Sequence, residues 1–311
     1  MIGRRRHSRS VIGVLVVLAI LVWIFFPRPT TPYGRETYVL VSDPMIVASW
    51  SEADRTLTLI TLPSDVAAEG THGYGTYSLA AFWRLGEIDK KDGTVLSESM
   101  SEALGIPVDG YIGPKIGEFT YGDNSLAAVK SIFSLKHVVG FIGGRYRTNI
   151  PFKKFIDLAW RLNFSRPDRV NNYDFIHNMS AVAQDSVLPD GSIVRILDPQ
   201  RLDAQLNTVF EDESVRRESV TVAVYNTTNM PSLGNRVGRL LTNVGVSVVT
   251  VGNDTPEADT CTVAGSDQAL KSKSANVIVA VLGCKRVVGD TSRADLIIRI
   301  GKTYAKRFIP N

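Results

Sequence analysis

Residues 220–245 read VTVAVYNTTNMPSLGNRVGRLLTNVG, and this stretch decides the fold of the last third of the chain. The run VTVAVYN is rich in β-branched and aromatic residues, which is typical of a strand. After the polar turn TTNMP, apolar residues recur at helical spacing: Leu233, Val237, Leu240, Leu241 and Val244. Gly245 then ends the pattern. The stretch predicts one strand followed by one helix.

The pattern continues as an alternating unit over residues 219–304. The runs VSVVTV, TCTVA and ADLIIRIG are typical of strands. Between the last two, Leu270, Val277, Ile278 and Val281 favour a second helix, although ANVIVAVLG also fits a buried strand by periodicity alone. The order strand, helix, strand, strand, helix, strand (βαββαβ) predicts a small α/β domain whose helices cover one face of its sheet.

Cys261 and Cys284, the two cysteines of the chain, both lie in this unit. Cys261 leaves a predicted strand and Cys284 follows the predicted second helix, so the two are plausible neighbours. In an exported domain such a pair oxidises to a disulfide, and the alternative is two buried thiols. Two thiols alone make a poor zinc site, because zinc takes about four ligands.

The N-terminus carries a concentrated charge and an apolar run. Four of the 35 Lys and Arg residues lie in residues 1–10, which leaves 31 basic against 31 acidic side chains in the rest of the chain. This balance argues against nucleic acid as a partner. Residues 11–26, VIGVLVVLAILVWIFF, are uncharged and lack a signal-peptide cleavage pattern. We expect a cytoplasmic tail at 1–10, an uncleaved transmembrane anchor at 11–27, and everything beyond it outside the cytoplasmic membrane. The alternative is a buried core helix.

A Pro-rich linker at 28–36 precedes a predicted mixed α/β domain at 37–212. Its expected strands are Thr37–Ser42, Met45–Ser51, Thr56–Thr61, Tyr173–Met179 and Ile193–Leu197. Its expected helices are Tyr77–Glu87, Thr94–Leu104, Ser125–Val139, 151–162 and Pro199–Phe210. The charged run EDESVRR at 211–217 is expected to connect this domain to the C-terminal one.

The sequence contains no P-loop, no G-x-S-x-G, no H-E-x-x-H and no G-x-G-x-x-G after a strand. The stretch Gly143 to Arg147 presents Arg145 and Arg147 after a glycine turn, an arrangement that could grip a phosphate with forked donors. The alternative is a pair of solvent-exposed arginines.

Several motifs together resemble the LytR-CpsA-Psr family of bacterial cell-envelope proteins. The strand VTVAVYN, the turn TTNMP, the helix LGNRVGRLLTNVG and the closing ADLIIRIGKTYA resemble the LytR C-terminal domain. In the first domain, the run from Asp43 to Val47 resembles the family's Asp-Thr-Ile strand, and LTLITLPSDV resembles its Ser-Ile-Pro-Arg-Asp turn. TYSLAA and ALGIPVDGYI resemble its Lys-Ile-Asn-Ala segment and its Leu-Gly-Ile strand entry.

The enzymes of this family transfer glycopolymers from a polyprenyl-pyrophosphate carrier to peptidoglycan, and the resemblance implies the same fold here. It also implies a site in which arginines, aspartates and a magnesium ion surround the pyrophosphate. Here the turn carries Ser64 where the family has arginine, and residues 121–135 hold Lys130 as their only cation. Asp43 and Asp65 stand at matching positions, where each also suits a turn cap. The candidate remnant of the pyrophosphate and metal site is therefore Asp43, Asp65, Arg145 and Arg147.

Because these arginines are missing, we expect the first domain to be degenerate and the protein to be a non-catalytic binding or assembly module anchored in the membrane. No cofactor is assigned to this module. Its expected partners are the membrane and a cell-wall polymer or lipid-linked glycopolymer. The alternative is an active transferase that uses Mg²⁺ and takes its cations from Arg145 and Arg147. A transcription regulator would need a cytosolic DNA-binding part, which ten residues before the span do not provide.

Overall fold

The computed structural model describes residues 33–309, except 116–118, 121–123, 188–190 and 290. The expected tail and membrane anchor, and most of the expected linker, lie outside the described residues. Within the described part, no helix combines the length and apolar character needed to cross a membrane.

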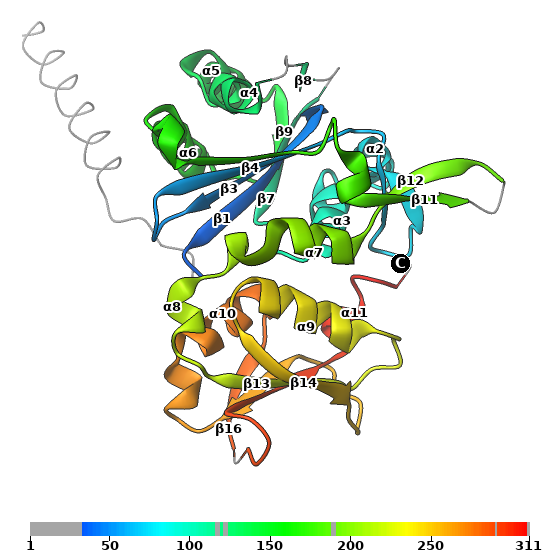
Figure 1. Cartoon of the computed structure of the whole chain (residues 1–311), viewed down its shortest axis with the longest axis vertical. Coiled ribbons are helices and arrows are strands. Elements are labelled where there is room, and N and C mark those ends of the chain that lie inside the picture. The colour runs from blue at the N-terminus through cyan, green and yellow to red at the C-terminus, as the bar shows by residue number, and fades with distance from the viewer. Residues whose placement is uncertain (1–32, 116–118, 121–123, 188–190, 290, 310–311) are drawn as a thin grey trace, which may run out of the picture. The chain divides into compact units, whose positions relative to one another are not determined.

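The first domain is built on a six-stranded mixed sheet in the order β10-β4-β3-β1-β7-β9 (Figure 1). Its strands are β1 (Arg35–Leu40), β3 (Met45–Ser51), β4 (Thr56–Leu62), β7 (Gly110–Pro114), β9 (Tyr146–Thr148) and β10 (Val170–Asp174). β1, β3 and β4 form an antiparallel meander, while β7 joins β1 and β10 joins β4 in parallel. The strands expected at 37–42, 45–51 and 56–61 are therefore present.

Both faces of this sheet are buried, because successive residues of its central strands point to opposite sides. Val39 and Val47 belong to one apolar cluster, with side chains of α2 (Leu79–Ile88), α3 (Thr94–Leu104) and α7 (Pro199–Leu206). Leu40 and Ile46 belong to another, with side chains of α4 (Ser125–Ile132) and α6 (Phe152–Asn163). The uninterrupted apolar runs of the sequence thus reflect a sheet covered on both sides.

Three expected elements differ from the structure. The helix expected at 199–210 ends at Leu206, and Asn207–Phe210 form a 3-10 turn. The helix expected at 125–139 is divided into α4 and α5 (Leu135–Ile142), with the break at Phe133 and Ser134. There the Phe133 ring packs 5.0 Å from the ring of Phe155, measured between centroids. The strand expected at 173–179 ends at Asp174, whose carboxylate accepts a hydrogen bond from the backbone of Ile176 and turns the chain.

Smaller elements complete the first domain. A four-stranded sheet has the order β11-β12-β5-β6, and β2 pairs with β8. Their strands are β2 (Ser42–Asp43), β5 (Ala67–Glu69), β6 (Thr76–Ser78), β8 (Phe119–Thr120), β11 (Ala183–Val187) and β12 (Ile193–Leu197). The 3-10 turns are η1 (Pro167–Arg169), η2 (Met179–Ala181) and η3 (Asn207–Phe210), followed by the short helix α8 (Glu213–Arg216).

The C-terminal domain contains a five-stranded sheet in the order β14-β13-β17-β15-β16. Its strands are β13 (Thr221–Asn226), β14 (Ser247–Asn253), β15 (Thr262–Gly265), β16 (Lys285–Val288) and β17 (Leu296–Ile300). Its helical elements are α9 (Leu233–Asn243), η4 (Ala269–Lys271), α10 (Lys273–Leu282) and α11 (Lys302–Ala305). The ambiguous run at 275–283 is helical, and Gly283 ends α10 with a left-handed backbone.

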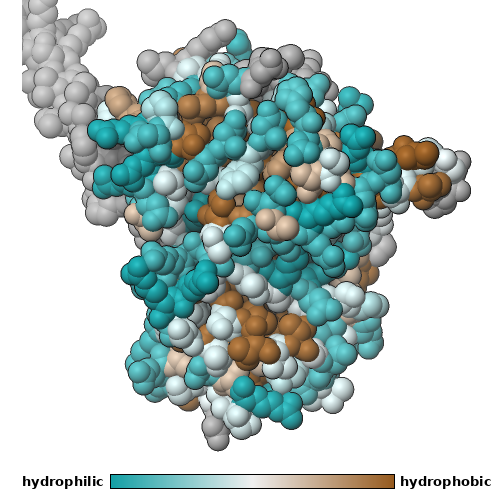
Figure 2. All heavy atoms as spheres, in the orientation of Figure 1, coloured by the Kyte–Doolittle hydropathy of each residue, from teal (hydrophilic) through white to brown (hydrophobic). Residues whose placement is uncertain are grey.

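The sheet contains one strand that the sequence pattern did not predict. β16 lies at an edge, and all four of its residues are exposed, so it has no buried face to produce an alternating pattern. At the opposite edge, β14 exposes Val249 and Val251, and Figure 2 shows apolar atoms gathered over this part of the domain.

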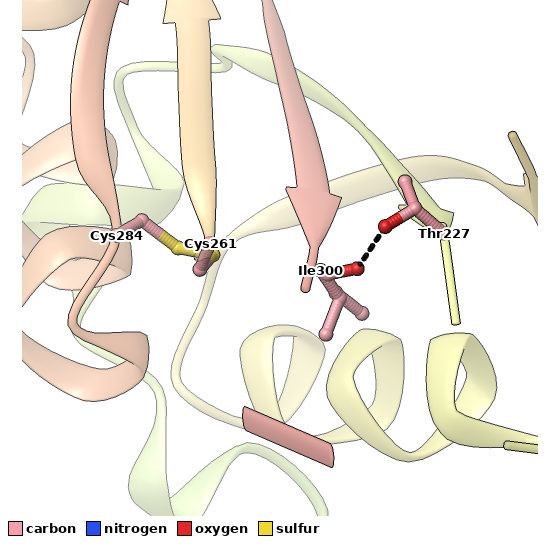
Figure 3. The surroundings of a disulfide bond; sticks show 4 residues. All are labelled: Thr227, Cys261, Cys284 and Ile300. Carbon is pink, nitrogen blue, oxygen red and sulfur yellow. Dashed lines mark hydrogen bonds between the residues drawn. A yellow bond between two sulfur atoms is a disulfide. The ribbon is translucent and has the colours of Figure 1, made fainter. Parts of the chain in front are cut away.

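Cys261 and Cys284 form a disulfide (Figure 3). Each cysteine directly precedes a strand, and the next residues, Thr262 and Lys285, are register partners in the parallel pair β15 and β16. This pairing brings the two Cα atoms to 4.4 Å. On the far side of β15, the Thr227 hydroxyl donates a 2.7 Å hydrogen bond to the carbonyl oxygen of Ile300.

Candidate functional site

A cavity of about 460 Å³ opens at one end of the six-stranded sheet and contains Asp43. Asp43 ends β2, and its carboxylate accepts a 2.9 Å hydrogen bond from the hydroxyl of Ser64, in the turn after β4. The carbonyl oxygen of Ser64 in turn accepts a hydrogen bond from Ala80 at the start of α2. The turn Pro63-Ser64-Asp65 is therefore tied to both the strand end and the helix.

One face of α2 forms a wall of this cavity. Ala80, Trp83, Arg84 and Glu87 all line it, and their spacing places them on the same side of a helix. The helix begins where the Ser78 side chain accepts a hydrogen bond from the backbone of Ala81. Leu79 and Phe82 are buried in the core, and their packing turns the face with Arg84 and Glu87 toward the cavity.

The end of β7 supplies the opposite wall. Pro114 and Lys115 line the cavity, and the backbone of Lys115 donates a hydrogen bond to the carbonyl oxygen of Arg145. Gly113 lies directly beneath the Trp83 ring, because a Cβ added there would lie 2.6 Å from a ring carbon. A larger residue at 113 would therefore displace the aromatic wall.

Charges in and around the cavity are of both signs. Arg84 and Lys115 are exposed cations in its lining, and Asp43 and Glu87 are its carboxylates. Arg147 on β9 forms an ion pair with Glu87. This hydrogen bond lowers the pKa of Glu87 and raises the pKa of Arg147. The charge of Arg147 is thus largely compensated by its partner.

The four site residues expected from the sequence do not all meet. Asp43 lines the cavity, and Arg147 borders it through Glu87. Arg145 is exposed, with its carbonyl oxygen bonded to Lys115. Asp65 lines a different cavity, of about 450 Å³, with Asp185 and Arg195 among its walls.

Sequence reasoning missed Arg84 and Lys115. The helix containing Arg84 was expected, but only its packing shows that Arg84 lies on the same face as Glu87. Lys115 follows β7 directly, and its place in the same cavity as Asp43 depends on the parallel pairing of β7 with β1. The sequence signal that could have identified Arg84 is its spacing of three residues from Glu87 in the helix that follows TYSLAA.

The resemblance implies a magnesium ion for a transferase, and the oxygen atoms of this cavity show how well the protein could bind one. Within the described residues, no group of three or more His, Cys, Asp or Glu side chains could hold a metal ion. In this cavity Glu87 is bound to Arg147, which leaves Asp43 as the principal oxygen ligand. Magnesium would need most of its roughly six oxygen ligands from a bound phosphate and water.

Residues 219–304 match the family model described as LytR cell envelope-related transcriptional attenuator. No curated protein sequence matches the chain. The matching solved structures include the transcriptional regulator yvhJ from Bacillus subtilis, at 14% identity and a TM-score of 0.39, over 57% of this chain and 94% of that chain. A transcriptional regulator from Enterococcus faecalis matches at 12% identity and a TM-score of 0.41, over 58% and 89% of the two chains.

A further match is the LytR-CPS2A-psr family protein YwtF (TagT) with bound octaprenyl pyrophosphate lipid, at 13% identity and a TM-score of 0.37, over 58% of this chain and 91% of that chain. Residues 219–304 match the LytR C-terminal domain family, as the sequence motifs of that stretch predict.

Proposed function

We propose that the chain is a single-pass protein of the bacterial cytoplasmic membrane whose exported part binds a lipid-linked glycopolymer at the Asp43 cavity without transferring it. The charge pattern of the N-terminal residues supports the anchor and its orientation, with residues 1–10 in the cytoplasm. The family match supports a place in the cell envelope. The ligand class comes from the resemblance of the first-domain motifs.

The observation that carries the proposal is the combination of cations at this cavity. Arg84 and Lys115 can attract a phosphate group, because both are exposed in the lining. Ser64 occupies the turn position where the resemblance expects arginine, and its hydroxyl is bonded to Asp43. A hydroxyl cannot replace a forked cation beside the charge that develops as a pyrophosphate leaves. Binding is therefore retained and transfer is lost.

The test uses the full chain in detergent, with farnesyl pyrophosphate as the probe and magnesium chloride present or absent. Calorimetry should show saturable binding, weakened about tenfold by Arg84→Ala or Lys115→Ala, since each removes a charged hydrogen-bond donor. Arg166→Ala, at an exposed arginine outside the cavity, is the matched control and should bind as the unmodified chain does. Lack of binding, or an equal loss in the control, contradicts the proposal.

The second candidate is an active glycopolymer transferase. It is favoured by the meeting of Asp43 with Arg84 and Lys115 in one cavity, because these groups could stabilise a leaving pyrophosphate together with magnesium. It predicts magnesium-dependent release of lipid phosphate when a lipid-linked glycopolymer and peptidoglycan are both supplied. Turnover that is lost in Asp43→Asn would establish the transferase and exclude the binding module.

A further inference from the structure

A second cavity, of about 540 Å³, lies where α9 of the C-terminal domain meets the first domain. It shares no lining residue with the Asp43 cavity. Its walls come from α3, the four-stranded sheet and α7 on one side, and from α9 on the other. Its volume is in the range of about 300 to 1,000 Å³ that is typical of sites for small ligands.

Two arginines of this cavity, Arg236 and Arg239, are each paired with a carboxylate. Arg239 donates hydrogen bonds of 2.8 Å to both carboxylate oxygens of Asp203. Arg236 likewise contacts both oxygens of Glu69 at 2.8 Å, and its guanidinium lies 5.3 Å from the centroid of the Phe308 ring. These pairs compensate their own charges, so they favour an uncharged ligand over an anion.

Three amide side chains face this cavity from three different elements. Gln184 lies on β11, Gln200 on α7 and Asn235 on α9. All three are exposed, and none makes a side-chain hydrogen bond with another described residue. Each amide offers two N–H donors and one acceptor oxygen. It can therefore both donate a hydrogen bond to a ligand hydroxyl and accept one from it.

Other groups in the lining add to this chemistry. The side chains of Thr76 and Ser232 provide hydroxyls, and Ile196 and Leu240 provide apolar surface. Burial raises the pKa of Glu102 to about 7. At neutral pH its carboxyl group is therefore partly protonated, and it can donate a hydrogen bond as well as accept one.

We propose that this cavity is a binding site for a short uncharged oligosaccharide, held by Gln184, Gln200 and Asn235. Sugar hydroxyls both donate and accept hydrogen bonds, and the C–H faces of sugar rings pack on apolar side chains. Because α9 contributes Asn235, the LytR C-terminal domain takes part in recognition directly. The site is separate from the Asp43 cavity and does not depend on the function proposed for it.

The test uses the full chain in detergent with cellotetraose, maltotetraose and the tetramer of N-acetylglucosamine as probes. Calorimetry and ligand-observed NMR should detect saturable binding of at least one probe at millimolar concentration. The double variant Gln200→Ala with Asn235→Ala should weaken this binding about tenfold or more, because it removes two sets of hydrogen-bond partners. Gln184→Ala should weaken it independently from the opposite wall.

Gln268→Ala is the matched control, since Gln268 is an exposed amide of the C-terminal domain, like Asn235, but lies outside the cavity, and it should leave affinity unchanged. Arg84→Ala should also leave oligosaccharide binding unchanged, which separates this site from the Asp43 cavity. Three outcomes overturn the proposal: none of the probes binds, the amide variants bind as well as the Gln268 control, or inorganic phosphate displaces the bound oligosaccharide. Thermal melting of every variant identifies any loss caused by unfolding.

Discussion

The Ser64 hydroxyl donates a 2.9 Å hydrogen bond to the carboxylate of Asp43, which joins the turn after β4 to the end of β2. These two residues are 21 positions apart and come together because β3 and β4 pair in antiparallel register between them. The bond satisfies one oxygen of Asp43 with a neutral donor. The turn thus keeps its position at the cavity but brings no positive charge to it.

Replacing Ser64 with arginine should place a guanidinium beside Asp43 at the wall of the cavity. We expect Ser64→Arg to increase the affinity for farnesyl pyrophosphate about tenfold, through added charge-assisted hydrogen bonds. Calorimetry on the full chain measures the change. Ser266→Arg, at an exposed serine of the C-terminal domain, is the control for nonspecific charge attraction. If both variants gain the same affinity for farnesyl pyrophosphate, position 64 does not contact the bound pyrophosphate.

Arg239 should stabilise the interface between the C-terminal domain and the first domain. Its guanidinium bonds both oxygens of Asp203 and the carbonyl oxygens of Glu102 and Ala103. We expect Arg239→Ala to lower the free energy of unfolding by about 2 to 3 kcal/mol, because several acceptors lose a charged donor. Urea unfolding followed by circular dichroism gives this value.

The comparison for Arg239 is Arg216, which pairs with Glu211 while 62% of the Arg216 side chain is exposed. Arg216→Ala should change the free energy of unfolding by less than about 0.5 kcal/mol, since solvent screens this pair. If the two substitutions change the free energy of unfolding by similar amounts, the stability of the domain interface does not depend on the Arg239 contacts.

Glu102 should make stability depend on pH. Burial raises its pKa in the folded protein from 4.5 to about 7, so the folded state binds more protons than the unfolded state between these values. The free energy of unfolding should therefore fall as the pH rises through this window. Glu102→Gln should reduce this slope and increase the melting temperature above pH 7 by about 3 °C. Melting curves across the window measure both, and an unchanged slope would contradict the prediction.

The disulfide should stabilise the C-terminal domain by restricting its unfolded chain. Cys261 and Cys284 close a loop with a sequence separation of 23 residues. Replacing both with serine should lower the free energy of unfolding by about 3 kcal/mol. Unfolding of the unmodified chain with and without dithiothreitol should show a similar difference. Dithiothreitol should have no effect on the double variant, and any effect there would point to another cause.

The sequence by itself predicted the alternating order of the C-terminal domain, because its strands and helices bury one side against a common core. The run at 275–283 left helix and strand open, because it is apolar on its more exposed side as well as on its buried side and so shows no clear periodicity. β16 was missed because an exposed edge strand has no apolar face. The break at Phe133 was missed because it coincides with a contact to Phe155, a residue distant in sequence.

The sequence also located the turn Pro63-Ser64-Asp65 and the serine in place of the expected arginine. Only the tertiary structure decided which charges share a cavity. Arg84 lines the same cavity as Asp43 because one face of α2 packs toward the strand ends, whereas Asp65, one residue beyond Ser64, lines another cavity. Local patterns fix helices, strands and turns through backbone geometry, but the meeting of side chains from separate elements depends on how those elements pack.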